Sequence, residues 1–205
     1  MFINQDGEQT VSDINFQESD PLKLGFLKYE GSADPTDVGS LGNIFKWNGL
    51  TLNVFFTYSF GNKLRLDPIF SDEYTDMIAT PNTFKNRWIV AGDEKYTNVP
   101  VIASKRQNKN DPDLDIAYSA YNYSNVRVAK GDFIRLKEVS LTYDFPSKLI
   151  EYAKLQTLSV KFMASNIALI YSDSKLHGQD PEFFNTGGVA TPMPKQFTLS
   201  LRAGF

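Results

Sequence analysis

Acidic side chains are the first residues of this sequence that could bind a metal. Asp111, Asp113 and Asp115 repeat the first three acidic positions of an EF-hand calcium loop. That loop type also needs glycine at its sixth position and glutamate at its twelfth, where this sequence has Ile116 and Asn122. We therefore predict a solvated loop here and no calcium site.

Histidine and carboxylate residues also give little support to catalysis. His177 is the only histidine, and the chain has no cysteine. Zinc sites and nucleophile–base pairs need several such groups together, and the remaining carboxylates are scattered. Asp180 and Glu182 flank Pro181, a pattern more typical of a turn than of a catalytic pair. The sequence therefore predicts no catalytic residues, no metal site and no cofactor, and so no enzyme.

Arg87 and Trp88 are the side chains best suited to binding. The flat face of tryptophan stacks on sugar rings or on other side chains, and arginine offers a planar fork of hydrogen-bond donors. We take these two residues as candidate contacts for a substrate or a lid-like partner. The alternative, that Trp88 packs inside its own loop, is the one that the sequence favours.

Composition narrows the class of protein. The 205 residues carry a net charge of −3 with no basic stripe, which argues against a nucleic-acid partner. The 16 Phe, 10 Tyr and 2 Trp could fill a core or form the aromatic girdles of a membrane barrel. No apolar run is long enough for a transmembrane helix. Residues 1–20 lack the features of a signal peptide, so we expect either a protein that is not exported or a piece of a longer chain.

Two segments alternate between apolar and polar residues, Leu50–Gly61 and Gln196–Phe205. A half-buried strand of a soluble sheet would alternate in the same way. These runs are about 10–12 residues long, however, whereas soluble strands average about 5–6 and membrane-spanning strands need about 9–11. We therefore predict that the apolar sides face lipid. The residues expected to face the lumen are Thr51, Asn53, Thr57, Ser59, Thr198, Ser200 and Arg202.

Three further strands complete the pattern. Phe133–Asp144 alternates with a phase slip near Lys137, which predicts a β-bulge. The next strand starts at Leu158 and slips near Asn166. A shorter strand, Leu41–Trp47, precedes a tight turn at Asn48-Gly49, which tolerates the positive φ of a type I′ turn.

The connections between these strands are of two kinds. One end of the sheet has the Asn48-Gly49 turn and a moderate connection with a short helix around Ser147–Ala153. The other end has loops at 62–131 and 172–195. Short periplasmic turns and long extracellular loops are typical of a barrel, whereas long loops without secondary structure count against a compact soluble domain. The predicted fold is all-β, an antiparallel up-and-down transmembrane β-barrel segment of about five strands, at 41–205, with 1–40 as the remnant of an extracellular loop.

The end of the chain adds a second barrel feature. An alternating apolar run closed by an aromatic residue is part of the signal that the barrel-assembly machinery reads in outer-membrane proteins. The residues that we assign to this outer-membrane assembly signal are Phe197, Leu199, Leu201 and Phe205.

Several stretches together resemble the C-terminal part of SusC/RagA-type TonB-dependent transporters of the Bacteroidetes outer membrane. The most specific are GDFIRLKEVSLTYDFP at 131–146, SVKFMASNIALIYSDSKLHGQDPE at 159–182 and TPMPKQFTLSLRAGF at 191–205. GSADPTDVGSLGNIFKWNGLTLNVFFTYSFGNKLRL at 31–66 and NRWIVAGDEKYTNVP at 86–100 complete the set. Their order and spacing fit the family from about residue 20 onward.

The resemblance implies a C-terminal fragment of a 22-stranded outer-membrane barrel that imports glycan or peptide nutrients. The partners it implies are outer-membrane lipid, a SusD-like surface lipoprotein as lid, the barrel-assembly machinery, and TonB only through an N-terminal part that this sequence lacks. Five strands cannot close a barrel, so we do not expect the chain to transport alone. The alternative of a different class is a soluble β-rich extracellular binding or adhesion module.

Overall fold

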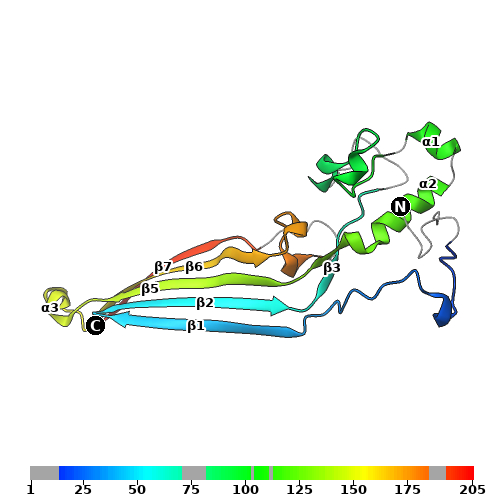
Figure 1. Ribbon diagram of the computed structural model, residues 1–205. Helices are drawn as coiled ribbons and strands as arrows, with labels where there is room; N and C mark the ends of the chain where they lie inside the picture. The colour runs from blue at the N-terminus through cyan, green and yellow to red at the C-terminus, as the bar shows by residue number, and fades with distance from the viewer. Residues whose placement is uncertain (1–13, 71–81, 103, 111–112, 185–192) are drawn as a thin grey trace. The chain divides into compact units, whose positions relative to one another are not determined.

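The chain divides into a loop unit and a sheet unit. The computed structural model describes residues 14–70, 82–102, 104–110, 113–184 and 193–205 (Figure 1). The loop unit comprises Met1–Gly31 and Arg65–Ala129, and the sheet unit comprises Ser32–Leu64 and Lys130–Phe205. No helix in the described ranges is long and apolar enough to cross a membrane.

The sheet unit is built on five antiparallel strands in the order β1-β2-β5-β6-β7. The strands are β1 (Asp37–Trp47), β2 (Leu50–Phe60), β5 (Phe133–Asp144), β6 (Thr157–Ser172) and β7 (Gln196–Gly204). They follow one another across the sheet in chain order, as the colours from blue to red in Figure 1 show. Their lengths of 9 to 16 residues exceed the average of about 5–6 for strands of soluble proteins. The five predicted strands and their up-and-down arrangement are confirmed.

Strand β1 begins earlier than predicted, at Asp37 instead of Leu41. Gly39 and Gly42 interrupt the alternation of apolar and polar residues, and glycine is depleted in strands. The sequence pattern therefore does not predict the first residues of β1. The pairing register places Gly39 opposite Tyr58 of β2, and a Cβ atom at Gly39 would collide with the Tyr58 ring. The glycine is therefore a cross-strand site that leaves room for an aromatic ring.

The predicted turn and both predicted phase slips are confirmed. Asn48 and Gly49, between β1 and β2, have φ angles of 45° and 82°, as a type I′ turn requires. The register between β2 and β5 jumps from Glu138 to Leu136 and leaves Lys137 as an extra residue. On β6 the register with β5 also shifts at the same level, next to Asn166, whose φ of 54° is left-handed. These bulges realign the two halves of each strand on the same face.

The two ends of the sheet differ. At one end lie the β1–β2 turn, the C-terminus, and the β5–β6 connection with α3 (Ser147–Ile150) and η6 (Glu151–Ala153) (Figure 1). This helix was predicted. At the other end the β6–β7 connection contains η7 (Ser174–Leu176) and η8 (Pro181–Phe183).

The long connection between β2 and β5 holds more secondary structure than the sequence indicated. Strands β3 (Lys63–Arg65) and β4 (Val128–Lys130) form a two-stranded sheet at its ends. Between them are η3 (Asn82–Asn86), η4 (Asp93–Lys95), α1 (Lys105–Asn110), α2 (Asp113–Tyr123) and η5 (Asn125–Arg127), and η2 (Pro21–Lys23) precedes the sheet. The sequence indicated short helices at Ser71–Met77, which lies outside the described residues, and at Asn82–Trp88, where η3 lies. It did not indicate α2 or the two short strands, which a small local core organises.

That core is aromatic. Ile69, Phe70 and Val99 are buried, and the Phe70 ring stacks on Tyr118 with centroids 4.5 Å apart. Asn122 on α2 fixes the backbone of the same segment. Its Oδ1 accepts hydrogen bonds from the N–H groups of Ile69 and Phe70 at 3.0 and 3.3 Å, and its Nδ2 donates to the Phe70 carbonyl at 2.9 Å. The loop unit therefore has an interior of its own.

Candidate lipid-facing surface and lumen-facing site

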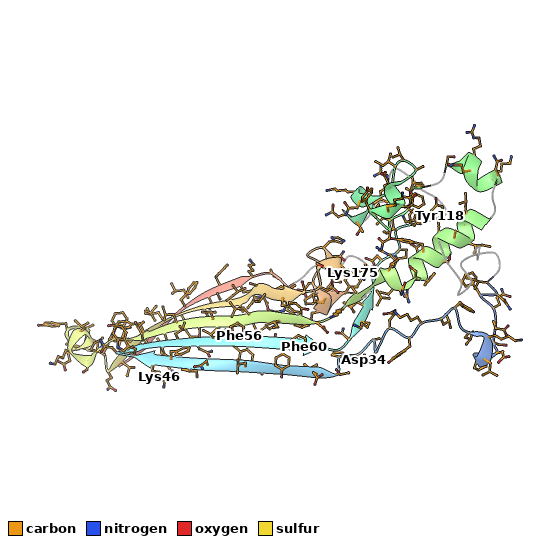
Figure 2. The ribbon with its side chains drawn as sticks, in the orientation of Figure 1. Asp34, Lys46, Phe56, Phe60, Tyr118 and Lys175 are labelled. Carbon is orange, nitrogen blue, oxygen red and sulfur yellow. The ribbon has the colours of Figure 1, made fainter. Side chains whose placement is uncertain are left out.

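One face of the five-stranded sheet is apolar from edge to edge. Directly opposed residues of antiparallel neighbours lie on the same face, so the register identifies each face. One cross-strand row contains only apolar side chains: Phe45, Leu52, Leu141, Phe162 and Leu199. Phe56 and Phe60, labelled in Figure 2, belong to this face by their alternation with Leu52 on β2. We call it the apolar face.

Much of the apolar face is solvent-exposed within the described structure, while its residues on β2 are half-buried. Leu199 is 74% exposed, Leu201 70% and Phe197 67%. Side chains of this kind are normally buried in a soluble domain, and a continuous exposed apolar surface marks contact with another apolar phase. The predicted assembly residues Phe197, Leu199 and Leu201 therefore lie on the apolar face, and Phe205 follows β7 at 87% exposure.

Aromatic side chains gather near the two ends of the apolar face. At the turn end, Trp47 is 76% exposed, and the rings of Tyr143 and Phe145 lie 4.8 Å apart. At the loop end, the rings of Tyr58 and Phe60 stack at 5.5 Å. Aromatic residues near both ends of the strands are typical of the interfacial girdles of transmembrane barrels. Further phenylalanines, such as Phe162 and Phe197 with ring centroids 6.2 Å apart, lie between the two ends.

The opposite face of the sheet is mostly polar, and we call it the polar face. One of its rows comprises Lys46, Thr51, Thr142, Lys161 and Ser200. The register places all the residues expected to face the lumen on this side: Thr51, Asn53, Thr57, Ser59, Thr198, Ser200 and Arg202. The prediction that these residues share one face is confirmed. That this face lines a lumen stays a prediction.

A buried ion pair lies on the polar face near the loop end. Arg135 of β5 pairs with Thr57 of β2, and its side chain is 6% exposed. Its Nη2 lies 2.5 Å from Asp180 Oδ1 and 3.2 Å from Glu182 Oε2, and the Asp180 side chain is 8% exposed. Asp180 also accepts a hydrogen bond from the Glu182 N–H at 3.1 Å and so caps η8, which confirms the predicted turn role.

Arg135 was not among the residues predicted from the sequence. The signal was present, because a lone arginine between Ile134 and Leu136 is a charge inside an apolar run. Such a charge needs a partner when it is buried. The partner lies 45 residues away in the sequence, and spacing along the chain does not reveal it.

Asp173 makes a second connection at the loop end. Its carboxylate accepts hydrogen bonds from the N–H groups of Lys130 at 2.8 Å and Lys175 at 3.0 Å. Burial alone would raise the pKa of Asp173, but these hydrogen bonds and the charges of the two lysines together lower it. The carboxylate is therefore stabilised in its charged form.

Arg87 and Trp88 lie together in the loop unit, next to its core. The Arg87 guanidinium lies over the Phe84 ring at 4.7 Å, and its Nη1 donates to the Phe84 carbonyl at 3.3 Å. The Trp88 N–H donates to the Val99 carbonyl at 3.1 Å. Both side chains are half-buried. These contacts are those of loop packing, and a contact with a substrate or lid stays a prediction.

The residues considered for metal binding are dispersed. Residues 111–112 lie outside the described part, while Asp113 and Asp115 belong to α2, so a solvated loop was the wrong prediction for them. His177 is exposed and follows η7 with a φ of 50°. Within the described ranges, no three His, Cys, Asp or Glu side chains gather as a metal site would require.

Comparisons with known proteins indicate the class of protein that this chain resembles. No protein-family model matches the chain. It is 24% identical over 192 residues to TonB-dependent receptor P39 of Formosa agariphila, and this match covers 88% of the chain and 17% of that relative. Two solved structures of a RagAB peptide importer, in its closed-closed and open-open states, share 23% identity with the chain. The closed-closed structure has a TM-score of 0.64 and covers 100% of this chain and 20% of its own chain. The open-open structure has a TM-score of 0.62 and covers 87% of this chain and 18% of its own chain.

The fold is therefore that of a transmembrane β-barrel segment, as predicted. The resemblance to the C-terminal part of SusC/RagA-type TonB-dependent outer-membrane transporters is confirmed by the sequence relative and by the two structural neighbours together. The chain spans about one sixth of the length of the curated relative that it matches.

Proposed function

We propose that the chain supplies the C-terminal strands of an outer-membrane TonB-dependent transporter that imports glycan or peptide nutrients. It acts as part of the barrel wall and carries no catalysis. Its partners in this role are outer-membrane lipid, the barrel-assembly machinery, a SusD-like surface lipoprotein, and TonB through the plug end of the complete transporter.

The observation that carries the proposal is the apolar face. It extends across all five strands, is exposed on β1 and β7 and in part on β5 and β6, and has aromatic residues near both ends. Lipid is the phase that such a surface fits. The outer edges of β1 and β7 have no partner strand in the described sheet. In lipid, each orphan backbone group costs several kcal/mol, which supports a role as one part of a closed barrel. The RagAB neighbours are named as peptide importers, and this favours peptides within the nutrient range.

Neighbouring residues of opposite faces offer a matched test. The chain has no cysteine, so single cysteines can be placed at Leu52 and Leu199 on the apolar face and at Asn53 and Thr198 on the polar face. Each is labelled with an environment-sensitive fluorophore in outer membranes of cells that produce the chain. We expect nitroxide-bearing lipid to quench the first pair and aqueous iodide to quench the second.

Quenching of Leu52→Cys and Leu199→Cys by iodide, as strong as at the polar positions, would contradict the proposal and favour the soluble binding module. Uptake of a labelled peptide digest and of a labelled oligosaccharide digest, by cells with and without the chain, then tests import. Loss of uptake of one digest in cells that lack the chain would support the proposal and identify the nutrient class. Unchanged uptake of both would argue against transport.

A further inference from the structure

The segment Asp173–Phe183, which we call the β6–β7 shelf, is folded back on the sheet. It contains η7 and η8, follows β6 directly, and includes Lys175, labelled in Figure 2. A loop that only linked two strands outside a barrel would leave its side chains in solvent. Here Leu176 is 1% exposed, and Pro181 is also buried.

The shelf is held on the polar face and not on the apolar one. Its acidic residues Asp180 and Glu182 both contact the guanidinium of Arg135. Arg135 belongs to the polar face because it pairs with Thr57 of β2, one of the predicted lumen-facing residues. Asp173 supplies an independent connection at the start of the shelf, through the backbone N–H of Lys130.

A buried ion pair is poor evidence of extra stability, because desolvation of the two charges offsets most of their attraction. It is better evidence that one conformation is specified over others, since a buried charge without its partner is strongly disfavoured. A guanidinium suits this use, because its terminal nitrogen Nη2 contacts both carboxylates of one loop at once. Arg135 therefore fixes where the shelf lies.

The tip of the shelf, His177–Gln179, is exposed. His177 and Gly178 both have left-handed φ angles, 50° and 86°, and form a tight bend between η7 and η8. His177, Gly178 and Gln179 are exposed, in contrast to Leu176 and Asp180 on either side. The bend thus presents an imidazole and an amide at the free side of an otherwise anchored segment.

We propose that Arg135 is a positioning residue that holds the β6–β7 shelf inside the mouth of the barrel, against its inner wall, so that the tip His177–Gln179 narrows the entrance for cargo. This inference rests on the proposed function, because the polar face becomes an inner wall only in a barrel. The imidazole and amide of the tip suit hydrogen bonding to the amide groups of peptides and to the hydroxyl groups of sugars. Without Arg135, Asp180 and Glu182 lose their partner, and the part of the shelf beyond η7 swings outward while its start stays held through Asp173.

The test uses the accessibility of a single cysteine in intact cells that carry the assembled transporter. His177→Cys is treated from outside with a small charged methanethiosulfonate and, separately, with a maleimide on a polyethylene glycol chain too bulky to enter a barrel. We expect the small reagent to react and the bulky one not to react. In the Arg135→Gln background, labelling by the bulky reagent should appear.

Two controls accompany this test. Tyr96→Cys, at a loop-unit position that is 90% exposed, should react with both reagents in every background. Lys137→Gln removes a neighbouring cation of the same strand that, within the described residues, forms no ion pair with the shelf. It should leave His177→Cys protected from the bulky reagent. Arg135→Lys keeps the charge and should restore protection at least in part.

The inference fails if the bulky reagent labels His177→Cys in the protein with Arg135 intact, a result that does not depend on the folding of any Arg135 variant. It also fails if Arg135→Gln assembles and His177→Cys stays protected. Failure of the proposed function has a different signature, in which labels at Leu52 and Leu199 report water instead of lipid.

Discussion

The sheet unit and the loop unit of this chain are stabilised in opposite ways. The loop unit encloses a small core, in which Phe70 is 7% exposed and packs on the aromatic rings of Tyr118, Tyr121 and Phe84. The sheet unit turns comparable side chains outward, and Phe197 of β7 is 67% exposed. The loop unit therefore depends on its own interior, whereas the sheet unit depends on the phase that surrounds it.

The largest expected effect comes from shortening an aromatic residue in each unit. Phe70→Ala leaves a cavity inside the loop core and should cost about 3–5 kcal/mol in local stability. Phe197→Ala loses only the transfer free energy, about 1.5–3 kcal/mol, because lipid chains can fill the space. Hydrogen exchange of the α2 amides measures the first cost, and exchange of the β6 and β7 amides measures the second. Equal losses of protection would contradict the proposed difference between the units.

This comparison also explains what the sequence could predict. Alternation with period two is local, so Leu50–Gly61 and Gln196–Phe205 reveal strands and faces directly. The bulge at Lys137 was visible for the same reason, as a change of phase within one strand. Each of these features needs only the few residues on either side of it.

The features that the sequence did not reveal join distant residues. Phe70 meets Tyr118 and Asn122 across about fifty positions, and Arg135 meets Asp180 across 45. Helix α2 has no strong apolar stripe from which a helix could be predicted, because the residues that it turns toward the core, Tyr118, Tyr121 and Asn122, are aromatic or polar. Gly39 alone predicts a break in a strand, whereas in the structure it lies opposite Tyr58 and leaves room for that ring. Such contacts depend on tertiary packing, which overrides local propensity.

A second pair of substitutions tests the two faces of a single strand. Leu199→Arg places a charge on the apolar face near the middle of β7, and should destabilise the assembled barrel by about 2–4 kcal/mol if lipid covers that face. Ser200→Arg, one residue along, places the same charge on the polar face and should cost less, because water in a lumen hydrates the charge. Lys161 lies directly opposite, so the cost that remains is mainly like-charge repulsion. Urea unfolding of the assembled protein in lipid vesicles measures both.

Ser200→Arg is the matched control for Leu199→Arg. Both variants carry the same side chain at neighbouring positions of one strand, so strand propensity and synthesis are alike. If Ser200→Arg is as destabilising as Leu199→Arg, the two faces do not differ in the medium that they contact, and the comparison with the loop unit loses its basis.

The smallest expected effect concerns acid and the β6–β7 shelf. Against the effect of burial, hydrogen bonds from backbone N–H groups lower the pKa of Asp173 below its ordinary value of 3.8 in the folded protein. A carboxyl group with a depressed pKa stabilises the folded state at pH values above its unfolded pKa, and this contribution is lost as the pH falls through the folded pKa. The attachment of the shelf through Asp173 should therefore be fully present at neutral pH and weaken only below about 3.8.

Pepsin, which is active in this acid range, can report the opening of the shelf through cleavage beside Leu176 or Phe183. The cleavage rate of the assembled protein should rise as the pH falls below that value. Asp173→Asn cannot ionise, so its cleavage should already be faster at the upper end of the range and should depend less on pH. Ser174→Ala, a change at an exposed neighbour, serves as the control and should follow the unmodified chain. Identical profiles for Asp173→Asn and the unmodified chain would mean that Asp173 does not hold the shelf, and would leave Arg135 as the attachment to examine.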